Sequence, residues 1–273
     1  RTWRWKCLLQ PIAPSAHLKE LFYITNVSTF WVFVLPMRLG EVARPYLLKK
    51  ILRVPLGSGV GTAVVERTID GLMVTGLFFV AVFTVDARYT IPMVLRWSAY
   101  ISLAVFTMVA LFLLASIISL KYIISCIKVI FKPLPQYFTD HSIALLQSFV
   151  DGVRLISRAH SLGGLFISSM LLWVFTVYAH VWALRSMSLD IPDISAACVL
   201  VSATIIGSMV PAGPGFLGTY QGSVLAALAM FHVPVTEAAA AGILVYGFNA
   251  LLCVGAGLPF ILFNHQWSIS RVN

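Results

Sequence analysis

Long runs of apolar residues are the main feature of the chain. Four of these runs are each long enough to cross a hydrocarbon core about 30 Å thick as a helix. They lie at about 58–85, 97–120, 162–186 and 238–263. Three further apolar segments are marginal in length, at 20–36, 194–210 and 216–231. The pattern predicts an all-α fold, a polytopic helical bundle in a membrane.

The composition agrees with a membrane location. Of the 273 residues, 59% are hydrophobic and 11% are charged, whereas a soluble domain carries about 25% charged residues. The net charge of +9 is explained by cytoplasmic loops, which are enriched in lysine and arginine, so we expect no nucleic-acid partner. The four cysteines have no paired spacing, so we expect neither a disulfide framework nor a metal site, and no cofactor.

Basic clusters predict which loops face the cytoplasm. Residues 38–53 and 121–161 are rich in lysine and arginine and are expected inside, whereas 86–96 and 187–193 are poor in them and are expected outside. Within the second cluster, the stretch "HSIALLQSFVDGVRLI" has apolar residues at helical spacing. We interpret it as an amphipathic helix at the membrane surface.

The chain opens on "RTWRWKCLLQ" and lacks an initial methionine. This basic, tryptophan-rich start predicts an N-terminally truncated chain that begins near the cytoplasmic end of a helix. Tryptophans near predicted helix ends are interpreted as an interfacial belt rather than a substrate-stacking site, namely Trp3, Trp5, Trp97, Trp182 and Trp267.

Two of the marginal segments are interrupted in the same way. Pro36 precedes Gly40 by four residues, as Pro211 precedes Gly215. Three predicted crossings separate the two copies, so they start from opposite sides of the membrane. We interpret them as two inverted repeats, each containing a Pro/Gly-broken re-entrant helix pair, an organisation found in transporters.

The repeats divide a single transmembrane domain over residues 1–273. Repeat 1 covers about 18–85, the connecting spans and the amphipathic helix about 91–186, and repeat 2 about 194–263. The residues expected at the helix breaks and turns are Pro36, Gly40, Pro211, Gly213, Gly215 and Gly218.

Three formal charges interrupt the apolar run 58–85, namely Glu66, Arg67 and Asp70. A charge inside a bilayer costs at least a few kcal/mol and marks a functional site by default. Helical spacing places the three near one another, and inward-facing partners would make them tolerable. The expected partners are Arg38, Glu41 and Arg44. A buried ion-pair network that only holds helices together is the alternative.

The motifs "LPMRLGEVARPYLL", "GTAVVERTIDGL" and "PAGPGFLGTYQG" resemble those of the lysylphosphatidylglycerol synthase transmembrane-region family of flippase-like proteins. The resemblance covers about residues 1–263. This chain departs from it at Tyr220 and Gln221, where many members carry glutamate, and at Gly247, where many carry arginine or histidine. The resemblance implies lipid translocation, in some members joined to a lipid-modifying synthase domain.

The charged residues are expected to form one polar cluster around a lipid headgroup. Arginine suits this role because its planar fork can hold a phosphate bidentately. The second repeat would add uncharged partners, and their neutrality favours an anionic headgroup. The expected substrate-binding residues are Arg38, Glu41, Arg44, Glu66, Arg67, Asp70, Tyr220, Gln221 and Asn249.

We therefore expect a translocator in the inner (cytoplasmic) cell membrane, rather than an enzyme, that moves a phospholipid or polyprenyl-phosphate-linked headgroup through a polar groove. The alternative is an intramembrane enzyme that acts on a lipid-phosphate headgroup, with Glu66 or Asp70 as general base. No catalytic or metal-binding residue is assigned. Membrane lipids are the expected partners, and a homo-oligomer or a partner synthase is left open. His180 is interpreted as a hydrogen-bonded packing residue rather than a proton relay.

Overall fold

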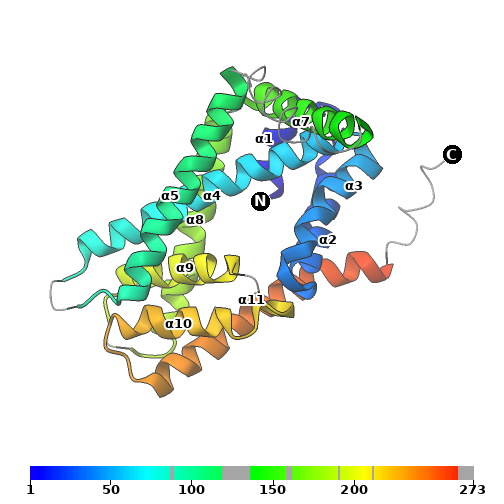
Figure 1. The fold of residues 1–273 in the computed structure, drawn as a ribbon. Coiled ribbons are helices and arrows are strands. Elements are labelled where there is room, and N and C mark those ends of the chain that lie inside the picture. Colours follow the sequence, from blue (N-terminus) through cyan, green and yellow to red (C-terminus); the bar gives the residue numbers. More distant parts are fainter. Residues whose placement is uncertain (87–88, 119–135, 158–161, 190, 211, 264–273) are drawn as a thin grey trace. The chain divides into compact units, whose positions relative to one another are not determined.

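A computed structural model describes the chain except for residues 87–88, 119–135, 158–161, 190, 211 and 264–273. The described part consists of helices joined by turns and loops and contains no β-strand (Figure 1). Its α-helices are α1 (Thr2–Leu9), α2 (Leu18–Val34), α3 (Ala43–Leu52), α4 (Leu56–Thr84), α5 (Met93–Ile118), α7 (Gln136–Ser157), α8 (Leu162–Arg185), α9 (Asp193–Met209), α10 (Thr219–Ala229) and α11 (Val235–Phe263). Two short 3₁₀ segments are η1 (Pro36–Val42) and η2 (Pro214–Phe216).

Four helices in the described part are long and apolar enough to cross a membrane. They are α4, α5, α8 and α11, and they coincide with the four apolar runs of the sequence. Large apolar side chains stay exposed along α5, among them Trp97, Ile101 and Leu111. Such exposure is expected for a helix surrounded by lipid, so the prediction of a polytopic all-α membrane fold is confirmed.

Both predicted helix breaks are present. Helix α2 ends just before Pro36, and Met37 and Arg38 then take left-handed backbone angles within η1. Helix α9 ends at Met209, and the chain turns through η2 before α10 begins. Proline removes a backbone donor and fixes φ, which explains why α2 does not continue through Pro36. The re-entrant placement of these pairs and their relation as inverted repeats stay predictions.

The chain folds into two compact units. Unit 1 comprises residues 1–25, 42–69 and 107–168, and unit 2 comprises 26–41, 70–106 and 169–273. Each unit therefore combines segments that lie far apart in the sequence. The division into repeats within one transmembrane domain, and the sidedness of the loops, stay predictions.

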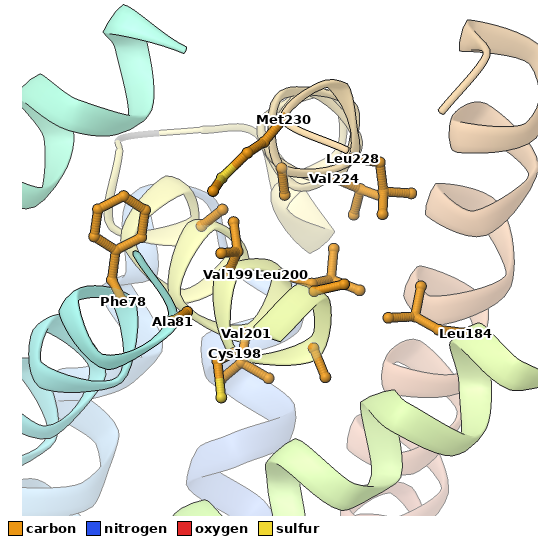
Figure 2. Close-up of a cluster of buried hydrophobic side chains, with 14 of the residues drawn as sticks. Phe78, Ala81, Leu184, Cys198, Val199, Leu200, Val201, Val224, Leu228 and Met230 are labelled. Carbon is orange, nitrogen blue, oxygen red and sulfur yellow. The ribbon is translucent and has the colours of Figure 1, made fainter. Parts of the chain in front are cut away.

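Unit 2 is built around α9, which is buried on nearly all sides. Residues 196–203 of this helix are almost fully covered. A helix that is apolar all round belongs in a core, and side chains from α4, α8 and α10 surround α9 (Figure 2). Ser202 adds a polar contact because its hydroxyl donates to the Val74 carbonyl of α4 at 2.9 Å.

Unit 1 joins the short helix α1 to parts of α2, α3, α7 and α8 through a second apolar cluster. Here α7 packs closely against the start of α4: a Cβ on Gly57 would lie 2.7 Å from the Cβ of Ser148, and the Ser58 hydroxyl donates to the Ser148 carbonyl at 2.8 Å. The predicted amphipathic helix is thus confirmed as a helix over Gln136–Ser157, with Val150 and Val153 buried. Its location at the membrane surface stays a prediction.

Candidate functional site

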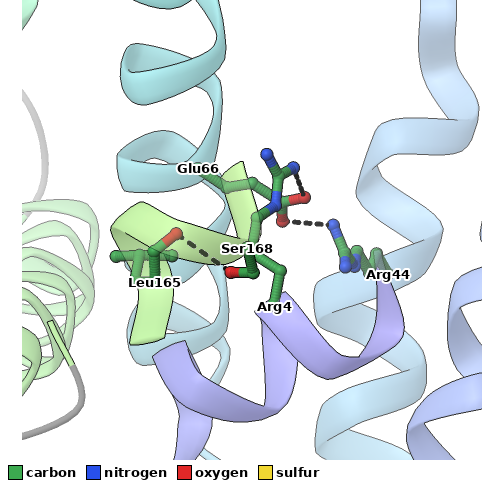
Figure 3. Close-up of polar contacts among 5 residues, drawn as sticks. All are labelled: Arg4, Arg44, Glu66, Leu165 and Ser168. Atoms are coloured by element: carbon green, nitrogen blue, oxygen red, sulfur yellow. Dashed lines mark hydrogen bonds and ion pairs between the residues drawn. The ribbon is translucent and has the colours of Figure 1, made fainter. Parts of the chain in front are cut away.

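A buried carboxylate lies at the centre of the site in unit 1. Glu66 of α4 is only 5% exposed, and each of its two oxygens accepts a hydrogen bond from a different arginine (Figure 3). Arg4 of α1 donates through Nη2 to Oε1 at 2.6 Å, and Arg44 of α3 donates through Nη1 to Oε2 at 2.5 Å. Charge-assisted bonds of this kind are about twice as strong as neutral ones. The ion pairs therefore tie α1, α3 and α4 together.

An aromatic ring holds the second arginine from another side. The Arg44 guanidinium lies over the Trp5 ring, 4.0 Å from its centroid, in the geometry of a cation–π contact. Trp5 is 1% exposed, so its interpretation as part of an interfacial belt is wrong. Its ring is covered because it packs with the apolar cluster of unit 1 and stacks on Arg44.

One edge of the Arg44 guanidinium has no partner. Its Nε and Nη2 atoms are buried and lack a hydrogen-bond partner among the residues that the structure describes. These two groups form the side of the guanidinium that can donate two parallel bonds to one oxyanion. Burial lowers the pKa of the Arg44 guanidinium, and the Glu66 carboxylate counteracts part of that shift. The arginine thus has a fixed orientation and a free bidentate edge.

The unpaired edge of Arg44 favours an anion. Buried charges and buried donors are costly unless they are paired. The group is therefore suited to a ligand that brings negative charge and oxygen acceptors.

A second charged group lies in unit 2 at the first helix break. Arg38 donates through Nε to Glu41 at 2.7 Å and through Nη1 to the Ser208 carbonyl at 3.1 Å. Its guanidinium also lies over the Phe216 ring. The Met37 amide donates to the Ala212 carbonyl at 3.0 Å. The two broken segments, far apart in the sequence, are thus bonded directly to each other.

Four of the six residues in the predicted charged cluster form two ion pairs, Arg44 with Glu66 in unit 1 and Arg38 with Glu41 in unit 2. Arg67 and Asp70 follow Glu66 on the same helix, and Asp70 is buried. The meeting of all six charged residues in one groove stays a prediction.

The three neutral residues expected from the second repeat make local contacts in unit 2. Tyr220 is buried and packs edge-to-face against Tyr246. The Gln221 side chain accepts a hydrogen bond from the Gly218 amide at 2.8 Å, which caps α10. The Asn249 oxygen accepts one from the Cys253 thiol at 3.6 Å. Their expected contacts with a headgroup stay predictions.

The turn between α9 and α10 depends on glycine. Gly215 has φ of +71° and Gly218 has φ of +86°, a region that side chains with a Cβ rarely adopt. A Cβ on Gly215 would also lie 2.7 Å from the Tyr246 hydroxyl. A Cβ placed on Gly213 would meet no atom within 4 Å. Pro211 lies outside the described residues.

Gly215→Ala is expected to destabilise the protein by about 1–2 kcal/mol, the cost of a left-handed residue with a Cβ. Gly213→Ala is the matched control, because it lies in the same turn with an ordinary φ of −64° and open space around it. Thermal unfolding of the two variants in detergent checks this. Equal unfolding temperatures would contradict the assigned role of Gly215.

The contact made by His180 fits its interpretation as a hydrogen-bonded packing residue. Its Nδ1 lies 2.8 Å from the Thr176 carbonyl one turn earlier in α8. Such a bond fixes the ring against its own helix.

Two site residues were missed by the sequence reasoning, Arg4 and Trp5. The "RTWRW" stretch was noted for its basic and aromatic character, but nothing in its spacing pairs it with a residue 62 positions further on. A signal was nevertheless present, since an arginine between two tryptophans, if buried, needs a partner for its charge.

The fold and this site define a multi-pass helical membrane protein with a buried arginine–glutamate centre. The chain belongs to the family described as the lysylphosphatidylglycerol synthase TM region, whose model matches residues 1–257. This confirms the family indicated by the sequence motifs.

Two curated proteins are similar to the chain. UPF0104 membrane protein MJ1595 of Methanocaldococcus jannaschii is 24% identical over 252 residues, which cover 88% of this chain and 73% of that protein. Glycosyltransferase AglD of Haloferax volcanii is 23% identical over 234 residues, which cover 76% of this chain but only 37% of that longer protein. No solved structure matches the chain.

Proposed function

We propose that this protein translocates lipids with an anionic headgroup, either a phospholipid or a polyprenyl-phosphate-linked lipid, across the inner (cytoplasmic) cell membrane. The observation that carries the proposal is the Arg44 guanidinium, which is held by Glu66 and Trp5 and keeps two buried donors that no described residue pairs with. Family membership and the four apolar helices support a role in the membrane and toward lipids.

A lipid phosphate fits the chemistry of this site. Two of its oxygens could accept bonds from Nε and Nη2 of Arg44 while Nη1 stays on Glu66. Because the guanidinium is already oriented, little side-chain entropy would be lost when the phosphate binds.

An enzyme acting on a lipid phosphate is the second candidate, and the similarity to AglD, which is named a glycosyltransferase, favours it. Glu66 is poorly suited to act as its general base, because both carboxylate oxygens already accept bonds from arginines. A base must lie within hydrogen-bond reach of the proton that it removes. This geometry supports a binding role for Glu66.

The proposal is tested by reconstituting the chain into vesicles that contain a trace of fluorescent lipid. We expect headgroup-labelled phosphatidylglycerol to move between leaflets faster than in empty vesicles, as measured by quenching of the outer leaflet. Matched vesicles with labelled phosphatidylcholine should show a smaller effect, since its choline adds a positive charge. Mass spectrometry of the recovered lipid should find it chemically unchanged.

Equal movement with and without protein would overturn the proposal. A recovered lipid whose headgroup has been cleaved or modified would support the enzyme instead.

A further inference from the structure

A pocket of about 250 Å³ lies within unit 2 between α4, α5, α9 and α10. Most of its lining is apolar, with Phe78 from α4, Leu95 from α5, Ile206 from α9 and Ala226 from α10. None of the predicted site residues lines it. The pocket is therefore a separate feature from the two charged groups described above.

The hydroxyl groups in the lining do not make the pocket polar. Ser98 donates to the Val94 carbonyl at 2.7 Å, Thr219 to the Phe216 carbonyl at 3.1 Å, and Ser223 to the Thr219 carbonyl at 2.7 Å. Each hydroxyl hydrogen is thus used within four residues along the chain. The pocket consequently offers hydrocarbon and no free hydroxyl donor, which favours an apolar ligand.

Two observations identify the class of ligand. Helices α4 and α5 are long apolar spans, so phospholipid acyl chains are the most abundant apolar molecules around them. Gly207 also lines the pocket, and the carbonyl of the next residue, Ser208, accepts a hydrogen bond from Arg38. An apolar cavity adjacent to a cationic side chain is complementary to a molecule with a hydrocarbon tail and a phosphate.

We propose that this pocket binds one acyl tail of a phospholipid whose phosphate lies near Arg38. The assignment rests on the proposed function in taking an anionic lipid as substrate, and it adds a site for the tail. Holding the tail would keep the lipid beside the broken segments while its headgroup moves.

A glycine substitution can fill the pocket without disturbing the helix that carries it. Gly222 lines the pocket, and a Cβ placed there meets no atom within 4 Å. The longer side chain in Gly222→Leu therefore extends from α10 into open space. Gly247→Leu is the matched control. Gly247 lies within α11 and does not line the pocket, and a Cβ placed on it would also meet no atom within 4 Å. Ala226→Leu fills the same pocket one turn further along α10.

The experiment uses vesicles of phosphatidylcholine with a small fraction of phosphatidylglycerol that carries a diazirine in one acyl tail. After irradiation, labelled peptides are located by mass spectrometry. We expect labelling of residues 203–210 and 219–226 above that of exposed residues on α5. Gly222→Leu and Ala226→Leu should lower this labelling at least several-fold, whereas Gly247→Leu should leave it unchanged.

Labelling of the pocket no stronger than that of the exposed α5 surface would overturn the assignment, as would unchanged labelling in both filled variants. The labelling does not depend on transport. Pocket labelling in a protein that moves no lipid would thus refute the proposed function while supporting a tail site, and transport without pocket labelling would do the reverse.

Discussion

Replacing Glu66 with glutamine is expected to destabilise the protein by about 3–5 kcal/mol, the cost of removing one partner from a buried ion pair. The change keeps the shape of the side chain but leaves Arg4 and Arg44 buried beside each other without their shared carboxylate. We expect a large fall in the yield of folded protein and in its unfolding temperature in detergent. Both are measured by size-exclusion chromatography and thermal unfolding.

Glu237→Gln is the matched control, because Glu237 is exposed in the first turn of α11. An exposed carboxylate at a helix start contributes at most about 1 kcal/mol. The double variant Glu66→Gln/Arg44→Gln should recover part of the lost stability by removing one of the uncompensated charges. If Glu66→Gln and Glu237→Gln unfold alike, Glu66 does not hold the arginines together.

The second large effect is expected on transport. Arg44→Lys keeps the positive charge near Glu66 but removes the planar fork with its free Nε and Nη2 edge. Losing charge-assisted bonds worth about 1.5–3 kcal/mol corresponds to roughly a ten- to hundred-fold fall in headgroup translocation. The vesicle assay for labelled phosphatidylglycerol measures it.

Arg185→Lys serves as the control for this substitution. Arg185 also pairs with an acid, donating to Asp193 at 2.6 Å, but its side chain is largely exposed and lies in unit 2. We expect it to transport like the unmodified protein. Full transport by Arg44→Lys would show that the guanidinium edge is not used by the substrate.

The membrane helices could be predicted from the sequence because hydropathy and length decide whether a helix can span a bilayer. The two breaks could also be predicted, since proline at 36 and glycine at 215 impose local backbone geometry. These are local properties. They depend on residues a few positions apart, which is the range over which sequence patterns are informative.

The site was predicted only in part, for a physical reason. Glu66 and Arg44 were recognised because charges in apolar segments need partners, but the choice of partner is a tertiary property. Arg4 approaches Glu66 from a short helix at the chain start, and no spacing rule relates the two. Gln221 shows the opposite case, because a side chain expected to face a headgroup caps its own helix.

The most direct test of the account detects contact between a lipid phosphate and the Arg44 guanidinium. The protein is labelled with ¹⁵N on its arginine side chains, reconstituted in phosphatidylglycerol bilayers and studied by solid-state NMR that reports nitrogen–phosphorus proximity. The account predicts a guanidinium signal that is weakened by nearby ³¹P in the unmodified protein and in Arg185→Lys but is missing from Arg44→Lys. A phosphorus-coupled spectrum that is the same in Arg44→Lys as in the unmodified protein would contradict it.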